Sequence, residues 1–211
     1  MNAFNWFGEG GPMLWIILVC GLVAVGVFLE RMLHLRRAAI SHRDFLQGVR
    51  NVLDRGNPEE AIQICEEAPG PVPALIRAAI LHRHEPRPVL AEAIGNVGRA
   101  EIARMERRVA VVATIGQIAP LLGLLGTVFG ILETVLVLRD QQPLIYAVHV
   151  TDGLLRALIA TAAGLIVAVP CFIMHNLLIV QIDRMVLDME AAETEITAYL
   201  IARHNVEKKA L

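Results

Sequence analysis

The chain has 211 residues, of which 55% are hydrophobic and 19% are charged, and its mean hydropathy is +0.55. This composition is too apolar for an ordinary soluble domain and is typical of a protein that crosses a membrane several times. The formal net charge of −2 argues against a nucleic-acid-binding protein, so no nucleic-acid partner is expected.

The first predicted element is a membrane-spanning helix over residues 10–30, preceded by a short outer segment, residues 1–9. Residues 10–29 carry no charge, and 20 helical residues at about 1.5 Å each cross a hydrocarbon core of roughly 30 Å. Trp6 and Trp15 bracket the start of this run, as interfacial anchors do. The charges that follow it are positive: Arg31, Arg36, Arg37 and Arg43. The positive-inside rule therefore predicts a periplasmic N-terminus.

Residues 31–108 are predicted to form a cytoplasmic helical domain. Apolar residues recur at helical spacing between 45 and 53. Asn57 followed by Pro58 and two glutamates is typical of a helix start, and the prolines between 69 and 73 interrupt the next apolar stripe. A further helix is expected over 74–82. From residue 89 a helix can run without interruption into the membrane.

The second predicted span covers residues 109–138 and carries no charge as far as Leu132. Its small residues are Gly123, Gly126 and Gly130, the last two forming a GxxxG pair. Such spacing lets helix backbones approach closely inside a bilayer, so these glycines are predicted packing positions. Pro120 removes one amide donor and should bend the helix.

The rest of the chain is predicted as a periplasmic loop (139–153), a third span (154–182) and a cytoplasmic helical extension with its tail (183–211). Gly164, spaced by four residues from an alanine on either side, repeats the small-residue pattern, and Pro170 is the second predicted packing proline. Beyond the third span an apolar stripe continues among charges, which indicates packing against the second helix. The predicted fold is thus an all-α membrane protein with three transmembrane helices, the second and third extended into a helical cytoplasmic domain.

Four of the polar side chains in the second and third spans are candidate functional residues: Thr127, Glu133, Arg156 and Thr161. If Thr127 lies level with Thr161, Glu133 and Arg156 differ in depth by only about 1.5 Å. We therefore expect this glutamate and arginine to pair, within a subunit or between neighbours. The alternative is that both extend to the outer interface. Helical threonines usually bond back to their own helix, so periodicity alone gives these two no further role.

The chain carries no sequence signature of an enzyme or of a metal site. The sequence contains no nucleophile elbow, P-loop, HExxH or GxGxxG motif, so no enzymatic activity and no cofactor are expected. His82 and His84 are two residues apart, which directs them to different faces of a helix, and no metal site is predicted. The three cysteines are scattered and are expected to act as small buried hydrophobic residues.

Three segments carry a family resemblance: residues 119–128 (APLLGLLGTV), 157–165 (ALIATAAGL) and 167–170 (VAVP). Together they resemble the MotA/TolQ/ExbB proton-channel family, and ExbB-like members most. Three spans and this length suit ExbB or TolQ better than MotA, which has a fourth span. The resemblance extends over nearly the whole chain.

The resemblance implies a homopentamer in the bacterial inner membrane, with its C-terminus in the cytoplasm. Its pore would enclose the single spans of an ExbD- or TolR-like partner whose membrane aspartate carries the proton. Proton flow would be converted into motion and passed to a TonB- or TolA-like transducer that serves outer-membrane transport. Thr127 and Thr161 match family positions that line the proton path, so their hydroxyls would relay a proton or hydrate the partner's carboxylate.

One position departs from the pattern, because ExbB proteins usually carry a glutamate where this chain has Arg156. A fixed cation beside a proton path raises the local electrostatic barrier. Either Glu133 neutralises the arginine, or the arginine meets the partner's aspartate directly. Two other functions stay open: a TolQ-like subunit of an envelope-maintenance system and a non-conducting membrane scaffold. The sequence also does not distinguish protons from sodium ions.

Overall fold

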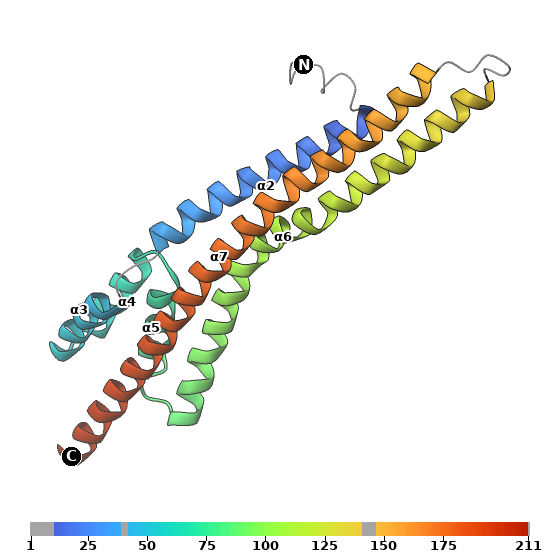
Figure 1. Cartoon of the computed structure of the whole chain (residues 1–211). Helices are drawn as coiled ribbons and strands as arrows, with labels where there is room; N and C mark the ends of the chain where they lie inside the picture. The colour runs from blue at the N-terminus through green and yellow to red at the C-terminus, as the bar shows by residue number, and fades with distance from the viewer. Residues whose placement is uncertain (1–10, 39–41, 141–146, 211) are drawn as a thin grey trace. The chain divides into compact units, whose positions relative to one another are not determined.

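The computed structural model describes residues 11–38, 42–140 and 147–210, and these form six helices with no strand among them. The helices are α2 (Gly11–Ala38), α3 (His42–Asp54), α4 (Pro58–Glu67), α5 (Pro71–Leu81), α6 (Arg87–Asp140) and α7 (Ala147–Ala210) (Figure 1). The all-α prediction is confirmed. The predicted outer segment 1–9 and most of the predicted loop 139–153 lie outside the described residues.

The helices fall into two compact units. Of the described residues, those within Gly11–Glu30 and Arg108–Leu177 form the membrane unit, and those within Arg31–Arg107 and 178–210 form the peripheral unit. Helices α6 and α7 are long enough to contribute to both units. The uninterrupted helix predicted from residue 89 into the second span is therefore present as α6.

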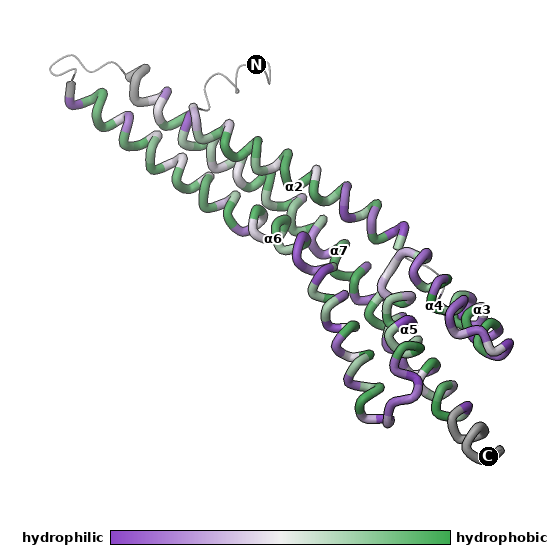
Figure 2. Tube along the Cα trace, turned by 180° about the vertical axis from the view of Figure 1, so that it is seen from behind, coloured by the Kyte–Doolittle hydropathy of each residue, from purple (hydrophilic) through white to green (hydrophobic). Residues whose placement is uncertain are grey.

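In the membrane unit, the parts of α2, α6 and α7 that belong to it lie side by side, and most of their residues are hydrophobic (Figure 2). Each of these three helices contains a stretch long and apolar enough to cross a membrane. The most apolar stretch of α7 is 33% buried, against 17% for α2 and for α6. Helix α7 is therefore the shared contact partner, and most of the remaining apolar surface is available to lipid or to other helices. The three predicted spans are confirmed.

The peripheral unit has an ordinary hydrophobic core. Side chains from α3, α5, α6 and α7 are almost completely buried in it, among them Val49, Ile76, Ile94 and Ile196. Apolar residues recur every three or four positions along α3 and form one buried face, as the periodicity predicted. This core fixes the short helices that follow the first span.

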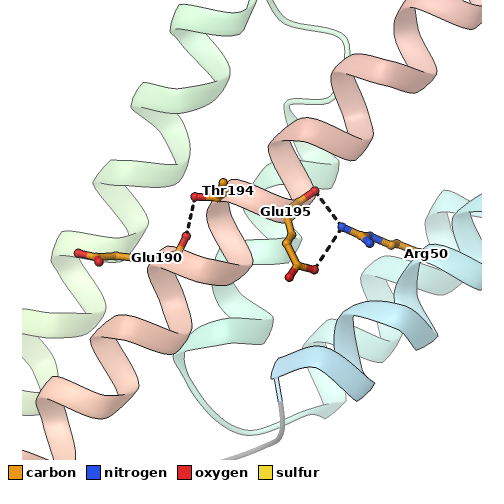
Figure 3. Close-up of polar contacts among 4 residues, drawn as sticks. All are labelled: Arg50, Glu190, Thr194 and Glu195. Carbon is orange, nitrogen blue, oxygen red and sulfur yellow. Dashed lines mark hydrogen bonds and ion pairs between the residues drawn. The ribbon is translucent and has the colours of Figure 1, made fainter.

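Charged and polar side chains of α3 and α7 form hydrogen bonds and ion pairs at the edge of that core. Arg50 donates to the backbone oxygen of Glu195 at 3.0 Å and lies 3.4 Å from its carboxylate (Figure 3). Tyr199 donates to Asp54 at 2.5 Å, and the guanidinium of Arg50 lies 5.5 Å from the tyrosine ring centre. The α3–α7 contact thus combines apolar packing with polar contacts at the surface.

Helix boundaries differ from the predictions at two places. Helix α5 begins at Pro71 and not at residue 74, because proline is well suited to the first helical turn, where its missing N–H has no partner to lose. Helix α7 begins at Ala147, seven residues before the predicted third span.

Gly70 precedes α5 with φ +118°, and a Cβ there would lie 2.6 Å from the backbone oxygen of Ala38, so this turn requires glycine.

Candidate functional site

The packing glycines of α6 face α7 within one chain. Gly123, Gly126 and Gly130 are all buried. A Cβ on Gly126 would lie 2.5 Å from the Cβ of Ala160, and one on Gly130 would lie 2.8 Å from the backbone oxygen of Gly153. The glycines therefore allow the two helices to approach with almost no side chain between them.

Gly164 makes the same contact from the α7 side. A Cβ there would lie 2.6 Å from the backbone oxygen of Ala119 and 3.1 Å from the Cα of Gly123. The predicted prolines, Pro120 and Pro170, both lie inside their helices. Pro170 lines an apolar groove of about 310 Å³ between α2 and α7, together with Leu18, Gly21, Leu22, Val25, Ile166, Val167, Cys171 and Met174.

The two threonines are half-buried, and Thr161 lies on the close α6–α7 contact, since a Cβ on Gly123 would lie 3.2 Å from its Cα. The hydroxyl of Thr127 donates to the backbone oxygen of Leu124 at 2.6 Å, and that of Thr161 donates to the backbone oxygen of Ala157 at 3.3 Å. Gly126 and Ala160, which precede the two threonines, are in contact. Because α6 and α7 are antiparallel, this contact places Thr127 two residues, or about 3 Å, from the level of Thr161 that the alignment assumed. Each hydroxyl bonds to its own helix, as is usual for helical threonines.

Glu133 and Arg156 form the predicted ion pair within a single chain. The Arg156 Nη1 atom lies 2.8 Å from the Glu133 Oε1 atom, and the side chains are 43% and 55% exposed respectively. The alternative in which both side chains extend separately to the interface is not what the structure shows. An exposed pair of this kind stabilises a protein by less than about 1 kcal/mol in water. The pair therefore contributes little to stability, and its relevance is that it places two charges on the membrane helices α6 and α7.

A cavity of about 130 Å³ adjoins this ion pair. Its lining residues come from α6 and α7 and are Glu133, Thr134, Val137, Asp152, Gly153 and Arg156. Two carboxylates and one guanidinium therefore border the same space, which is large enough for several water molecules. The sequence analysis did not identify Asp152, because it placed this residue in a loop.

Gly153 and Thr134 fix the backbone at this level, and the sequence analysis missed both. A Cβ on Gly153 would overlap the Thr134 hydroxyl and lie 3.0 Å from the backbone oxygen of Gly130. Thr134 itself donates to that same oxygen at 2.8 Å. The four-residue spacing of Gly153 from Ala157 was the signal that could have revealed a helical packing position.

A second ion pair in the membrane unit joins Glu30, at the end of the α2 span, to Arg108, at the start of the α6 span. Both residues border the predicted charge-free stretches. One ion pair of the membrane unit thus joins the end of the α2 span to the start of the α6 span, and the other joins α6 to α7.

The arrangement defines a class of protein: a helical membrane protein with three spans and a few polar groups on a tightly packed pair of helices. The sequence matches the MotA/TolQ/ExbB proton channel family over residues 38–191. Because this match covers most of the chain, the protein belongs to that family.

Individual relatives carry ExbB and TolQ names. The chain is 28% identical over 184 residues to a biopolymer transport protein ExbB homologue of Methanothermobacter thermautotrophicus, covering 86% of this chain and 64% of that protein. It is 40% identical over 91 residues to the biopolymer transport protein ExbB of Aquifex aeolicus, covering 43% of this chain and 61% of that protein. The chain thus spans somewhat less than two thirds of these two relatives. The Tol-Pal system protein TolQ of Haemophilus influenzae is 36% identical over 83 residues, covering 39% of this chain and 36% of that protein.

Proposed function

We propose that this protein is an ExbB-like subunit of an inner-membrane complex that couples proton flow to a TonB-type energy transducer for outer-membrane transport. The observation that carries the proposal is the family match over residues 38–191, which includes all four polar candidates on α6 and α7. The names of the ExbB relatives support the same conclusion. We assign the chain no enzymatic activity.

The proposed assembly is a homopentamer around an ExbD- or TolR-like single-span partner. Large apolar side chains are exposed along the membrane helices, for example Leu121, Leu125, Leu158 and Leu165, and exposed apolar surface of this kind supports assembly with further helices or with lipid. In this proposal the N-terminus is periplasmic and the C-terminus cytoplasmic, as the arginines after the first span favour.

Thr127 and Thr161 are proposed to border the proton path. A hydroxyl that donates to a backbone oxygen keeps its own lone pairs as acceptors. Each threonine can therefore accept a hydrogen bond from water or from a protonated carboxyl on the partner. The driving force is about 2.3 kcal/mol per proton per 100 mV of membrane potential, so a few protons suffice for one conformational step.

A TolQ-like role in envelope maintenance is the second candidate, supported by the similarity to TolQ of Haemophilus influenzae. The two roles differ in phenotype. Deletion of the gene would abolish transducer-dependent uptake through the outer membrane in the first case. In the second case it would make cells leak periplasmic proteins and become sensitive to detergent.

The proposal is tested by purifying the full chain with the small membrane protein that co-purifies with it and reconstituting the complex in liposomes containing a pH-sensitive dye. An imposed membrane potential should drive proton uptake at the same rate with or without sodium ions, and the chain reconstituted alone serves as the control. Liposomes that stay impermeable to protons would contradict the proposal and favour a scaffold. Flux that requires sodium would replace the proton with sodium as the coupling ion.

A further inference from the structure

Arg156 has two carboxylates within the same cavity, although it pairs with only one of them. Its Nη1 atom holds Glu133 at 2.8 Å, and Asp152 lines the cavity beside it. Among the described residues, Arg156 forms no ion pair with Asp152. A guanidinium carries five N–H donors, but only Glu133 is bound here, so Arg156 does not bridge the two carboxylates in this structure.

The helix geometry favours Asp152 as the second carboxylate. Asp152 and Arg156 are four residues apart on α7, and side chains at this spacing are neighbours on one helix face. An acidic residue one turn before a basic residue is also the more favourable order with respect to the helix dipole. The pair can therefore form by side-chain rotation alone.

The backbone around the cavity is fixed more firmly than these side chains. Gly153 and Thr134 are in close contact, and the Thr134 hydroxyl is bonded to the Gly130 oxygen. By contrast, Glu133 is 55% exposed and Arg156 is 43% exposed. A change of partner at Arg156 thus requires no movement of α6 against α7.

We propose that Asp152 is the alternative partner of Arg156, and that exchange of the guanidinium between the two carboxylates releases Glu133. The charged groups that line the cavity are two carboxylates and one guanidinium, so while Arg156 holds one carboxylate, the other has no cation beside it within this lining. While Arg156 holds Asp152, Glu133 has no cation beside it in the cavity. While Arg156 holds Glu133, that carboxylate is held in the ion pair. Asp152 is then a positioning residue, and this role rests on the proton-conducting function proposed above.

The exchange is tested with a carbodiimide probe, which reacts with protonated carboxyl groups in apolar surroundings. The full chain with its co-purified partner is reconstituted in liposomes, treated with dicyclohexylcarbodiimide, and analysed by mass spectrometry for modification at Glu133. Asp152→Asn removes the alternative partner and should slow modification of Glu133 by about two- to fivefold, the factor that one exposed ion pair provides. Asp152→Glu should restore the rate, and Arg156→Gln should increase it.

Asp183→Asn is the matched control, because Asp183 is an exposed carboxylate on the same helix and does not line the cavity. Asp152→Ser repeats the test in case the asparagine variant is not recovered in the membrane. An unchanged or increased rate in either Asp152 variant, or an unchanged rate in Arg156→Gln, would overturn the proposal. Proton flux is measured in the same liposomes. If the unaltered complex conducts no protons but the variants show the expected modification pattern, the proposed function alone is contradicted. If the unaltered complex conducts protons but the pattern is not seen, the exchange alone is contradicted.

Discussion

The membrane unit and the peripheral unit are held together in different ways. In the membrane unit, α6 and α7 meet where side chains are missing, at Gly123, Gly126, Gly130 and Gly164. In the peripheral unit, contacts are made by large buried side chains such as Ile76 and Ile94. The reason is the solvent: water drives apolar side chains together, whereas lipid does not, and helices inside a bilayer associate through close backbone packing. The following predictions test this difference, from the largest expected effect to the smallest.

The largest effect concerns the thiol of Cys65 in the core of the peripheral unit. Burial raises the pKa of this thiol from its usual value near 9 to about 12, an effect that the nearby Arg77 guanidinium partly offsets. Because the thiolate is the reactive form, alkylation by iodoacetamide at pH 8 should be about two to three orders of magnitude slower in the folded protein than after denaturation. The rate is measured by mass spectrometry of the Cys65 peptide.

The same group predicts a pH dependence of stability. Above pH 9 the unfolded chain loses the thiol proton while the folded chain retains it, so the contribution of Cys65 to the free energy of unfolding should decrease as the pH rises from about 9 to about 12. Cys65→Ala should remove this part of the pH dependence. Equal alkylation rates in the folded and denatured protein would show that the core around Cys65 is open to reagent.

Truncation of the peripheral core comes next. Ile76→Ala removes a fully buried side chain and should lower the free energy of unfolding by about 2–5 kcal/mol. This is measured by denaturant titration in detergent micelles. Leu81→Ala on the same helix, where the side chain is 52% exposed, is the control and should change stability by about 0.5 kcal/mol or less. A similar loss in both variants would mean that α5 does not supply a specific core.

Added volume should destabilise the membrane unit. In Gly164→Val the new side chain would meet the backbone of α6, and the expected cost is about 1–3 kcal/mol or more. Gly26→Val on α2 is the control, since nothing lies within 4 Å of a Cβ at that position. The apparent unfolding temperature in detergent is measured for both. If the two variants lose equal stability, close helix packing at Gly164 does not hold this unit together.

The smallest effect is expected at the surface contacts between α3 and α7. Arg50→Ala removes the bonds to Glu195 and should cost about 1 kcal/mol or less, with a smaller cost at high salt because exposed ion pairs are screened. Arg43→Ala, an exposed position on the same helix, is the control. A loss of several kcal/mol that does not depend on salt would show that the Arg50 contacts, rather than the apolar core, fix α3.

Much of the architecture could be predicted from the sequence because each signal is local. Twenty residues without charge indicate a span, and an unbroken helical pattern indicates that α6 continues out of the membrane. The pairing of Glu133 with Arg156 could be predicted from their similar depths in the membrane, because the rise per residue is constant in a helix. The family resemblance is confirmed by the match over residues 38–191. The roles of the four polar residues in a proton path stay predictions.

The residues of α7 that the sequence analysis missed have their role because of their neighbours on α6. Asp152 and Gly153 were assigned to a loop, because the charge-free run of the third span begins only after Arg156. The helix begins at Ala147, and only the position of Thr134 and Gly130 on α6 shows that Gly153 has to lack a side chain. Likewise, the small residues of α6 indicate close packing but not whether the neighbouring helix belongs to the same chain.

The central claim, that the hydroxyls of Thr127 on α6 and Thr161 on α7 border a proton path, is tested most directly by proton flux through liposomes. These contain the complex with Thr127→Ala or Thr161→Ala. The account predicts a loss of most flux in both variants, retention of flux in the serine variants, and normal flux in Thr114→Ala, whose exposed hydroxyl makes the same kind of bond to its own helix, donating to the Ala110 oxygen at 2.8 Å. Normal flux in both Thr127→Ala and Thr161→Ala would contradict the claim.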